Sequence, residues 1–231
     1  MSFVTEPEKH VPIVYDVDVA VAGASVSGVF AALAAARNGA ETVLIDRFGS
    51  VGGNIGPGMI CNGTLASGQP HVKAGYQASV FPGFMGIPKE FIERHVALGG
   101  GCIPPYSECH YLMDSNIASY TALKMLEESG VNLLLSTYAA DPILEGNSVK
   151  GIFIENKSGR QAVKAKVVVD ATGEADVAKR AGVPILYPKT IYHEIDGHAP
   201  TGMGLPFVLV CLDFYKEVKS RHRLRYSLGK V

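Results

Sequence analysis

Residues 16–53, DVDVAVAGASVSGVFAALAAARNGAETVLIDRFGSVGG, decide the fold of this chain. They give, in order, an apolar strand, a glycine-containing turn, an alanine-rich helix, a second apolar strand and an acidic residue. This order predicts a strand–helix–strand unit with two parallel strands. The N-terminus of its helix directs N–H groups and the positive end of the helix dipole toward a pyrophosphate, so the stretch predicts a dinucleotide site.

The glycine turn carries most of this prediction. Gly23 is expected to form the tight turn, and Gly28 is expected to let the helix, about residues 27–38, pack closely on the first strand. Ser25 stands where the G-x-G-x-x-G pattern has its middle glycine. Its Cβ takes up room near the phosphates, although its hydroxyl can donate a hydrogen bond to them. The alternative is a unit whose glycines serve packing only.

An acidic residue follows the second strand. Asp46 lies 23 residues after Gly23, at the predicted tip of that strand. A carboxylate in this place can accept hydrogen bonds from ribose hydroxyls. Its presence favours the dinucleotide site over the packing-only alternative.

Length and composition limit the possible classes of protein. The chain has 231 residues, is 47% hydrophobic and 19% charged, and carries a net charge of −1. It is long enough for one large domain or for one domain and part of a second. The charge gives no overall attraction to nucleic acid or anionic membranes, no apolar run spans a bilayer, and the polar N-terminus is unlike a signal peptide. We therefore expect a cytoplasmic protein without nucleic-acid or membrane partners.

The cysteines give no sign of a disulfide framework or a metal centre. Cys61, Cys102, Cys109 and Cys211 form no C-x-x-C pair, and free thiols in a reducing compartment are expected. Cys102, Cys109 and His110 come close in sequence, but their spacing matches no usual ligand pattern. No metal site is predicted.

Beyond the opening unit, the chain is first rich in glycine. Residues 49–110 are predicted to be irregular apart from a helix at 87–98. Such a segment is often functional because its backbone can approach a ligand closely; the alternative is a surface excursion. An amphipathic helix is predicted at 115–130, with Ser115 or Asn116 as its N-cap.

Three alternating runs in residues 131–173, with turn signals between them, predict a β-meander with short hairpins. Ala165–Asp170 is mostly β-branched and apolar, so this last strand is expected to join a buried parallel sheet. It ends in VVVDATG, residues 167–173, and a short helix follows. Ligands bind at the carboxyl edge of such sheets, so the end of this motif is expected at the site. The alternative is an ordinary strand-to-helix turn.

Four features therefore coincide: the glycine turn, Asp46, the Gly52–Gly53 pair and the late VVVDATG. Together they resemble the FAD-dependent oxidoreductases of the glutathione-reductase-type fold, a group that includes fumarate-reductase-like flavoproteins. The resemblance covers about residues 10–190. It implies an α/β fold: a Rossmann-like FAD-binding domain with a parallel sheet and a β-meander, and part of a second, substrate domain. It also implies FAD as the cofactor.

The resemblance further assigns residues to the parts of FAD. The pyrophosphate would lie at the glycine turn, the adenosine ribose after the second strand, and the ribityl and phosphate region along the next loop. Adenine would touch a meander backbone, and the flavin side would border the VVVDATG motif. In that order the residues are Gly23, Ser25, Ser27 and Gly28; Asp46 and Arg47; Ser50, Gly52 and Gly53; Ala139; and Thr172 and Gly173.

The resemblance divides the chain into an N-terminal arm (1–14), an FAD-binding domain (15–186) with the glycine-rich insertion at 49–110, and a final part (187–231). That final part is expected to begin a substrate or cap domain, or to bind a partner. Family members are usually longer and close the flavin end of the site with a C-terminal glycine-rich segment, which residues 187–231 do not resemble. The chain is therefore expected to be a shortened or N-terminal portion of such a protein. It is a truncated product, a split-gene product whose flavin site a partner chain or a second copy completes, or a shortened form that binds nucleotide without catalysis.

The implied activity is hydride transfer from a small organic substrate to flavin, in which the protein supplies orientation and electrostatics. A base is expected to take the accompanying proton, and the candidates are His193, His198 and Cys61; solvated or structural roles for these residues are the alternative. A second hypothesis is a non-catalytic nucleotide-binding or assembly subunit of a split flavoenzyme. A third, an NAD-binding Rossmann protein, fits less well because a simple Rossmann domain continues with alternating helices.

Overall fold

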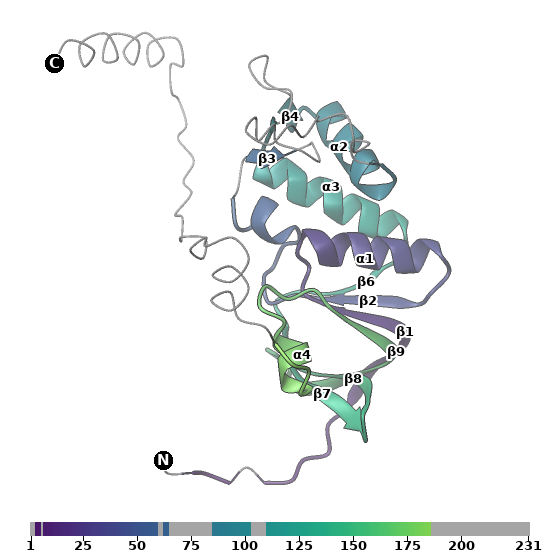
Figure 1. Ribbon diagram of the computed structural model, residues 1–231, viewed down its shortest axis with the longest axis vertical. Helices are drawn as coiled ribbons and strands as arrows, with labels where there is room; N and C mark the ends of the chain where they lie inside the picture. Colours follow the sequence, from purple (N-terminus) through teal and green to yellow (C-terminus); the bar gives the residue numbers. More distant parts are fainter. Residues whose placement is uncertain (1–2, 6, 60–61, 65–84, 103–109, 186–231) are drawn as a thin grey trace, which may run out of the picture. The chain divides into compact units, whose positions relative to one another are not determined.

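The first apolar stretch forms the central strand of a six-stranded sheet (Figure 1). It pairs in parallel with the strands on both sides, and a further parallel strand lies beyond one of them. Two antiparallel strands extend the other side, giving the order β6-β2-β1-β9-β8-β7. The strands are β1 (Ile13–Ala22), β2 (Thr42–Ile45), β6 (Asn132–Leu134), β7 (Tyr138–Glu145), β8 (Ser148–Asn156) and β9 (Gly159–Asp170).

This computed structural model describes residues 3–5, 7–59, 62–64, 85–102 and 110–185. All of them belong to one unit, residues 1–200. The α/β fold with parallel strands and a β-meander is the one that the sequence predicts.

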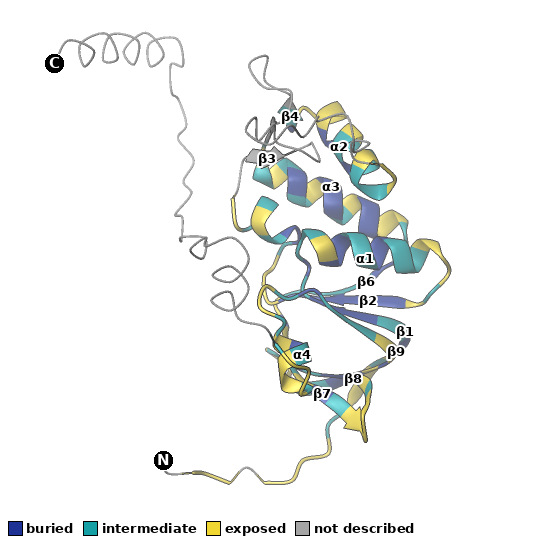
Figure 2. Cartoon of the chain, in the orientation of Figure 1, coloured by how far each residue is buried: buried dark blue, intermediate teal, exposed yellow. Residues whose placement is uncertain are grey.

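Three helices gather on one face of the parallel strands (Figure 1). They are α1 (Val26–Arg37), α2 (Ile87–Ala97) and α3 (Ser115–Glu128). Leu33 of α1 and Met125 of α3 are fully buried in one cluster with Val21 and Leu44 of the sheet, and the buried stripes of the helices are visible in Figure 2. The alanines of α1 leave room for this close packing, because they add little bulk between helix and sheet.

A second core fills the opposite face of the same strands. Ala20 and Val43 lie in one buried cluster with Ile152 of β8 and Val177 of the short helix α4 (Asp176–Arg180). Since successive strand residues point to opposite faces, Ala20 serves this core while Val21 serves the helix side. The meander and α4 thus cover what a second layer of helices covers in a doubly wound fold.

The close packing expected of the glycine turn is confirmed. Gly23 has a φ of 93°, which favours glycine. A Cβ at Gly28 would lie 1.8 Å from the carbonyl oxygen of Gly23 and 3.1 Å from the Cβ of Ala171. The start of α1 therefore lies directly against the ends of two neighbouring strands.

Two details of the predicted helices differ from the structure. α1 begins one residue earlier than expected and ends at Arg37 with Asn38 as its C-cap. The N-cap of α3 is Asp114, so the prediction of Ser115 or Asn116 is wrong. The Asp114 carboxylate accepts hydrogen bonds from the N–H groups of Asn116 and Ile117, at 2.8 and 3.0 Å, which ties up two first-turn donors.

The meander also departs from the prediction. The first of the three alternating runs is divided: β6 pairs in parallel with β2, and only β7 starts the meander. Ser136, with a φ of 50°, breaks the run between them. β9 joins the parallel sheet as expected, but its Val167 is 54% exposed, because no described element covers that position.

Part of the segment predicted to be irregular is ordered. Besides α2 it contains the short 3-10 helix η1 (Gly53–Ile55) and strands β3 (Asn62–Thr64) and β4 (Gly101–Cys102), which pair with β5 (His110–Met113) in a three-stranded antiparallel sheet. The sequence did not predict these strands because β3 and β4 are only three and two residues long, too short for an alternating pattern.

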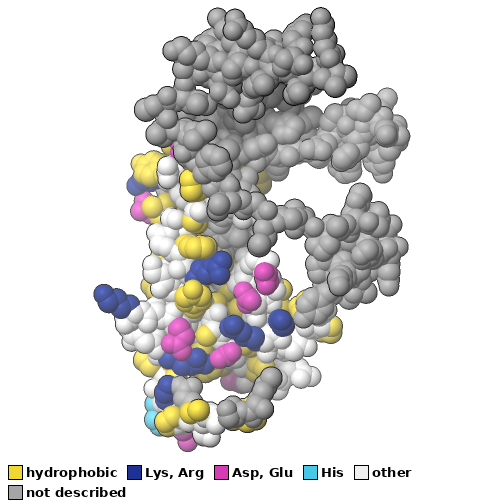
Figure 3. Space-filling model, turned by 90° about the vertical axis from the view of Figure 1, so that its left-hand side faces the viewer, with side chains coloured by type: hydrophobic (Ala, Val, Ile, Leu, Met, Phe, Trp, Pro, Cys, Tyr) yellow, Lys and Arg dark blue, Asp and Glu magenta, His cyan; other side chains and the backbone are white. Residues whose placement is uncertain are grey.

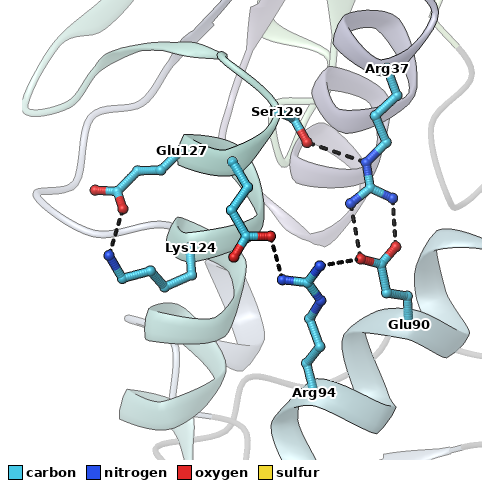
Figure 4. A network of polar contacts seen from close by, with 7 residues as sticks. Arg37, Glu90, Arg94, Lys124, Glu127 and Ser129 are labelled. Carbon is cyan, nitrogen blue, oxygen red and sulfur yellow. Dashed lines mark hydrogen bonds and ion pairs between the residues drawn. The ribbon is translucent and has the colours of Figure 1, made fainter.

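Ion pairs fasten α2 to the other two helices (Figure 4). Arg37 of α1 donates to both carboxylate oxygens of Glu90 on α2, at 2.5 and 3.1 Å. Arg94 of α2 lies 2.8 Å from Glu90 and 2.5 Å from Glu128 of α3. The hydrogen bond from Arg37 holds the pKa of Glu90 below its ordinary value. This network attaches α2 to α1 and α3.

Gly28→Ala is expected to lower the free energy of unfolding by about 3 kcal/mol or more, because the new methyl group would push against backbone that cannot move aside. Thermal or urea unfolding of the chain measures the change. Gly173→Ala is the control: a Cβ there meets no heavy atom within 4 Å, so a change under about 0.5 kcal/mol is expected. Equal losses in both variants would contradict this account of Gly28.

Glu90→Gln is expected to cost about 1 kcal/mol of stability near pH 7. The difference from wild type should shrink as the pH falls below the ordinary glutamate pKa of 4.5. The pKa of Glu90 is lowered in the folded chain, so its contribution is present above the unfolded-state value and lost as pH falls through the folded-state value. Urea unfolding over an acid pH series, with exposed Glu127→Gln as control, checks this; a pH-independent difference would argue against it.

Candidate functional site

Three segments that are distant in sequence meet at the carboxyl edge of the parallel strands (Figure 1). They are the glycine turn (23–28), the loop after β2 (46–53) and the end of the VVVDATG motif (171–173). The N–H of Gly52 donates to the carbonyl of Ala24 at 2.8 Å. The N–H of Ala171 donates to Ala22, also at 2.8 Å. The structure therefore brings together segments that the sequence assigned to one site.

The contact between these segments leaves no room for side chains at two glycines. A Cβ on Gly53 would lie 2.9 Å from the Cα of Ser25, and a Cβ on Gly23 would lie 2.6 Å from the carbonyl oxygen of Ala171. The loop after β2 and the end of the VVVDATG motif thus each contact the glycine turn where one of the two partners is a glycine without a side chain. Close backbone approach is what a diphosphate site at a helix N-terminus needs.

Ser25 is the N-cap of α1. Its Oγ accepts a hydrogen bond from the N–H of Gly28 at 3.2 Å and donates to the carbonyl of Ala171 at 2.9 Å. The exposed hydroxyl of Ser27 lies 2.8 Å from the same Oγ. First-turn N–H groups have no partner within a helix, so those of Val26 and Ser27 remain for an anion.

Asp46 is almost fully buried, and its carboxylate accepts hydrogen bonds from two backbone N–H groups. One oxygen accepts the N–H of Ala24 at 2.5 Å, and the other accepts the N–H of Phe48 at 2.7 Å. The residue therefore fixes the glycine turn to its own loop. Each carboxylate oxygen has a further lone pair, which leaves capacity for a ribose hydroxyl.

The loop after Asp46 is tied to the connection between β6 and β7 and to α3. Arg47 is exposed, and its guanidinium lies 4.8 Å from the centre of the Phe48 ring. The N–H of Ser136 donates to the carbonyl of Phe48 at 2.9 Å. The half-buried Ser50 precedes Val51, whose carbonyl accepts a hydrogen bond from Ser119 of α3.

Ala139 lies near this loop through β7. The N–H of Thr137, two residues earlier, donates to the carbonyl of Asp46 at 2.8 Å. Arg180 of α4 donates to the carbonyl of Ala140 at 2.7 Å and reaches that of Ala139 at 3.4 Å. Sequence reasoning did not single out Arg180, because nothing in its neighbourhood shows that α4 lies against β7.

Asp170 is the residue of the VVVDATG motif that sequence reasoning missed. Its carboxylate accepts hydrogen bonds from the N–H of Thr172 at 3.0 Å, the Thr172 hydroxyl at 2.6 Å and the N–H of Ala178 at 2.7 Å. The Thr172 hydroxyl also accepts from the N–H of Asp176, at 2.8 Å. The side chain and the N–H of Thr172 are thus engaged within the protein, whereas Gly173 is exposed and can face a ligand. An aspartate directly before the Ala-Thr-Gly turn was the available signal.

Figure 3 looks at the side of the molecule where these strands end. On its described part, acidic, basic and hydrophobic side chains are mixed. Within the ranges that the structure describes, no helix has the length and apolarity to cross a membrane, and no group of three or more His, Cys, Asp or Glu is placed to hold a metal ion. The candidate bases His193, His198 and Cys61 lie outside these ranges.

A family model described as FAD dependent oxidoreductase matches residues 18–211. The chain belongs to this family, and its cofactor is FAD. The family resemblance and the cofactor predicted from the sequence are thereby confirmed.

Digeranylgeranylglycerophospholipid reductase 2 of Methanopyrus kandleri is 27% identical to this chain over 173 residues, which are 74% of this chain and 41% of that protein. The chain thus spans less than half the length of this relative.

Two crystal structures show a similar fold. THI4 of Thermovibrio ammonificans has a TM-score of 0.52 and 21% identity, over 73% of this chain and 64% of that chain. A geranylgeranyl bacteriochlorophyll reductase-like protein of Thermoplasma acidophilum has a TM-score of 0.52 and 22% identity, over 76% and 44% of the respective chains. At this identity the likeness concerns the fold alone.

The described residues fit the ADP half of FAD. They offer a capped helix N-terminus with an exposed hydroxyl, a carboxylate at the end of β2, and a tight glycine turn where a Cβ would meet backbone. The assignment of individual residues to parts of the cofactor stays a prediction.

Asp46→Asn is expected to lower stability by about 1–3 kcal/mol, because the amide places an NH2 group against one of two backbone N–H donors in a nearly buried site. FAD affinity should fall about tenfold or more, since the turn is released and a carboxylate acceptor is lost. Unfolding and quenching of flavin fluorescence measure the two effects.

Glu145→Gln, an exposed change on the β7–β8 hairpin, is the matched control and should alter neither quantity. If Asp46→Asn has the same stability and the same FAD affinity as this control, Asp46 does not hold the glycine turn and the loop after β2 together.

Proposed function

We propose that this chain holds the ADP half of FAD at the carboxyl edge of its parallel sheet, as part of an enzyme that transfers a hydride from a small organic substrate to flavin. One observation carries the proposal: the glycine turn, the loop from Asp46 to Gly53 and the turn from Ala171 to Gly173 are joined by hydrogen bonds and by close contacts at glycines. Ligands bind at this edge of open α/β sheets.

The described residues would act as binding and orienting groups. The first turn of α1, with Ser27, would hold the diphosphate, and Asp46 would accept from the adenosine ribose. Arg47 and the backbone near Ala139 would border the adenosine, and Gly52, Gly53 and Gly173 would let the chain approach the cofactor closely.

When bound, FAD supplies the hydride acceptor. A base for the substrate proton is sought first among His193, His198 and Cys61.

The direction of transfer and the substrate are part of the proposal. The Methanopyrus kandleri relative is named as a reductase of a digeranylgeranyl phospholipid. Reduction of an unsaturated substrate is therefore a second direction of hydride transfer to test beside oxidation of a small molecule. The cytoplasmic location stays a prediction from composition.

A partner chain or a second copy is proposed to complete the flavin half of the site. The support for this is that the described residues offer contacts for the ADP half of FAD. In the alternative function, a non-catalytic nucleotide-binding subunit, the chain alone binds FAD and shows no turnover.

The purified chain is expected to bind FAD and to show its visible absorption. Because the site holds the ADP half, ADP should displace FAD, whereas FMN, which lacks this half, should bind at least about tenfold more weakly. Fluorescence titration with all three ligands measures this. Absence of FAD binding, or equal affinity for FMN and FAD, would refute the proposed site.

The catalytic part needs a separate measurement. Anaerobic mixing of the FAD-loaded chain with a panel of small alcohols, amines and hydroxy acids should bleach the flavin if oxidation is the activity, and reduced flavin should be reoxidised by an alkene if reduction is. An FAD-loaded chain that does neither alone, but does one after a partner is added, favours the subunit alternative.

A further inference from the structure

The side chain of Ser25 is already engaged within the protein. Its hydroxyl lies 2.9 Å from the carbonyl oxygen of Ala171 and 3.2 Å from the N–H of Gly28. A carbonyl oxygen only accepts and an amide N–H only donates. The single proton of Ser25 is therefore directed to Ala171, and the N–H of Gly28 is capped by the same oxygen.

The hydroxyl of Ser27 is in a different position. It lies 2.8 Å from Ser25 Oγ, and the two oxygens share a hydrogen bond in which either one can be the donor. While the Ser25 proton is directed to Ala171, this bond must use the proton of Ser27. Ser27 is exposed in the first turn of α1, so its hydroxyl can rotate toward an anion at the helix N-terminus.

We propose that Ser25, which replaces the middle glycine of the G-x-G-x-x-G pattern, and Ser27 have different roles. Ser25 is a positioning residue that fastens α1 to the end of β9, and Ser27 donates the side-chain hydrogen bond to the diphosphate. The proposal rests on the proposed FAD site. It names a role for Ser25 that a glycine cannot have, because glycine has no hydroxyl to join the two motifs.

The backbone at Ser25 supports this division. Its φ of −65° and ψ of 178° are extended values that any residue adopts, so glycine is not needed there. The room for its side chain comes from Gly53 instead, where a Cβ would lie 3.2 Å from Ser25 Cβ. A side chain at position 25 is accommodated because position 53 has none.

The test uses Ser25→Ala, Ser27→Ala and Ser158→Ala, the last an exposed change in the β8–β9 turn as control. Three quantities are measured for each full chain: the melting temperature without ligand, and the affinities for ADP and for adenosine by competition with FAD. Adenosine lacks the diphosphate, so the ratio of the two affinities reports on phosphate contacts alone.

Ser25→Ala is expected to lower the ligand-free melting temperature by several degrees, through loss of the cap and of the link to Ala171, and to leave the ratio of ADP to adenosine affinity unchanged. Ser27→Ala is expected to leave the melting temperature unchanged and to reduce that ratio about tenfold. Ser25→Thr, which keeps the hydroxyl, should restore most of the lost melting temperature.

The opposite pattern would overturn the proposal: a reduced ratio in Ser25→Ala, or an unchanged ratio in Ser27→Ala. A wild-type chain that binds neither FAD nor ADP would refute the proposed function instead. The melting temperature of Ser25→Ala would still decide whether Ser25 fastens the helix.

Discussion

The contact between the first turn of α1 and the carbonyl of Gly23 is the constraint on which the rest of the site depends. Because Gly28 has no side chain, the helix start lies against the ends of β1 and β9. Any bulk at position 28 would move the helix N-terminus away from the strand ends. The positions of the capping serine and of the first-turn N–H groups follow from this one contact.

Two carboxylates then hold the backbone around this contact. Asp46 bridges the glycine turn and the loop after β2, and Asp170 organises the turn that leads into α4. A carboxylate that accepts several backbone N–H bonds fixes a loop more firmly than a neutral side chain, since charge-assisted bonds are the stronger ones. The carboxyl edge of the sheet, where the candidate site lies, is thus arranged largely by internal hydrogen bonds.

The two faces of the sheet contribute in different ways. On one face the helices pack through small and aliphatic side chains. The ion pairs of Arg37, Glu90, Arg94 and Glu128 attach α2 to α1 and α3. On the other face the meander supplies Ile152 to a second core. The meander therefore takes part in the core, and Thr137, directly before β7, donates a hydrogen bond to the carbonyl of Asp46.

The sequence by itself determined the strand–helix–strand unit and the dinucleotide class, because glycine spacing and apolar runs act locally or between adjacent elements. It also indicated the family, through the resemblance that four motifs carry together. It did not show that β6 belongs to the parallel sheet, that Asp114 caps α3, or that Ser25 bonds to Ala171, 146 residues away. Only the tertiary structure decided these, because each depends on which distant backbone groups meet when two buried cores form on one sheet.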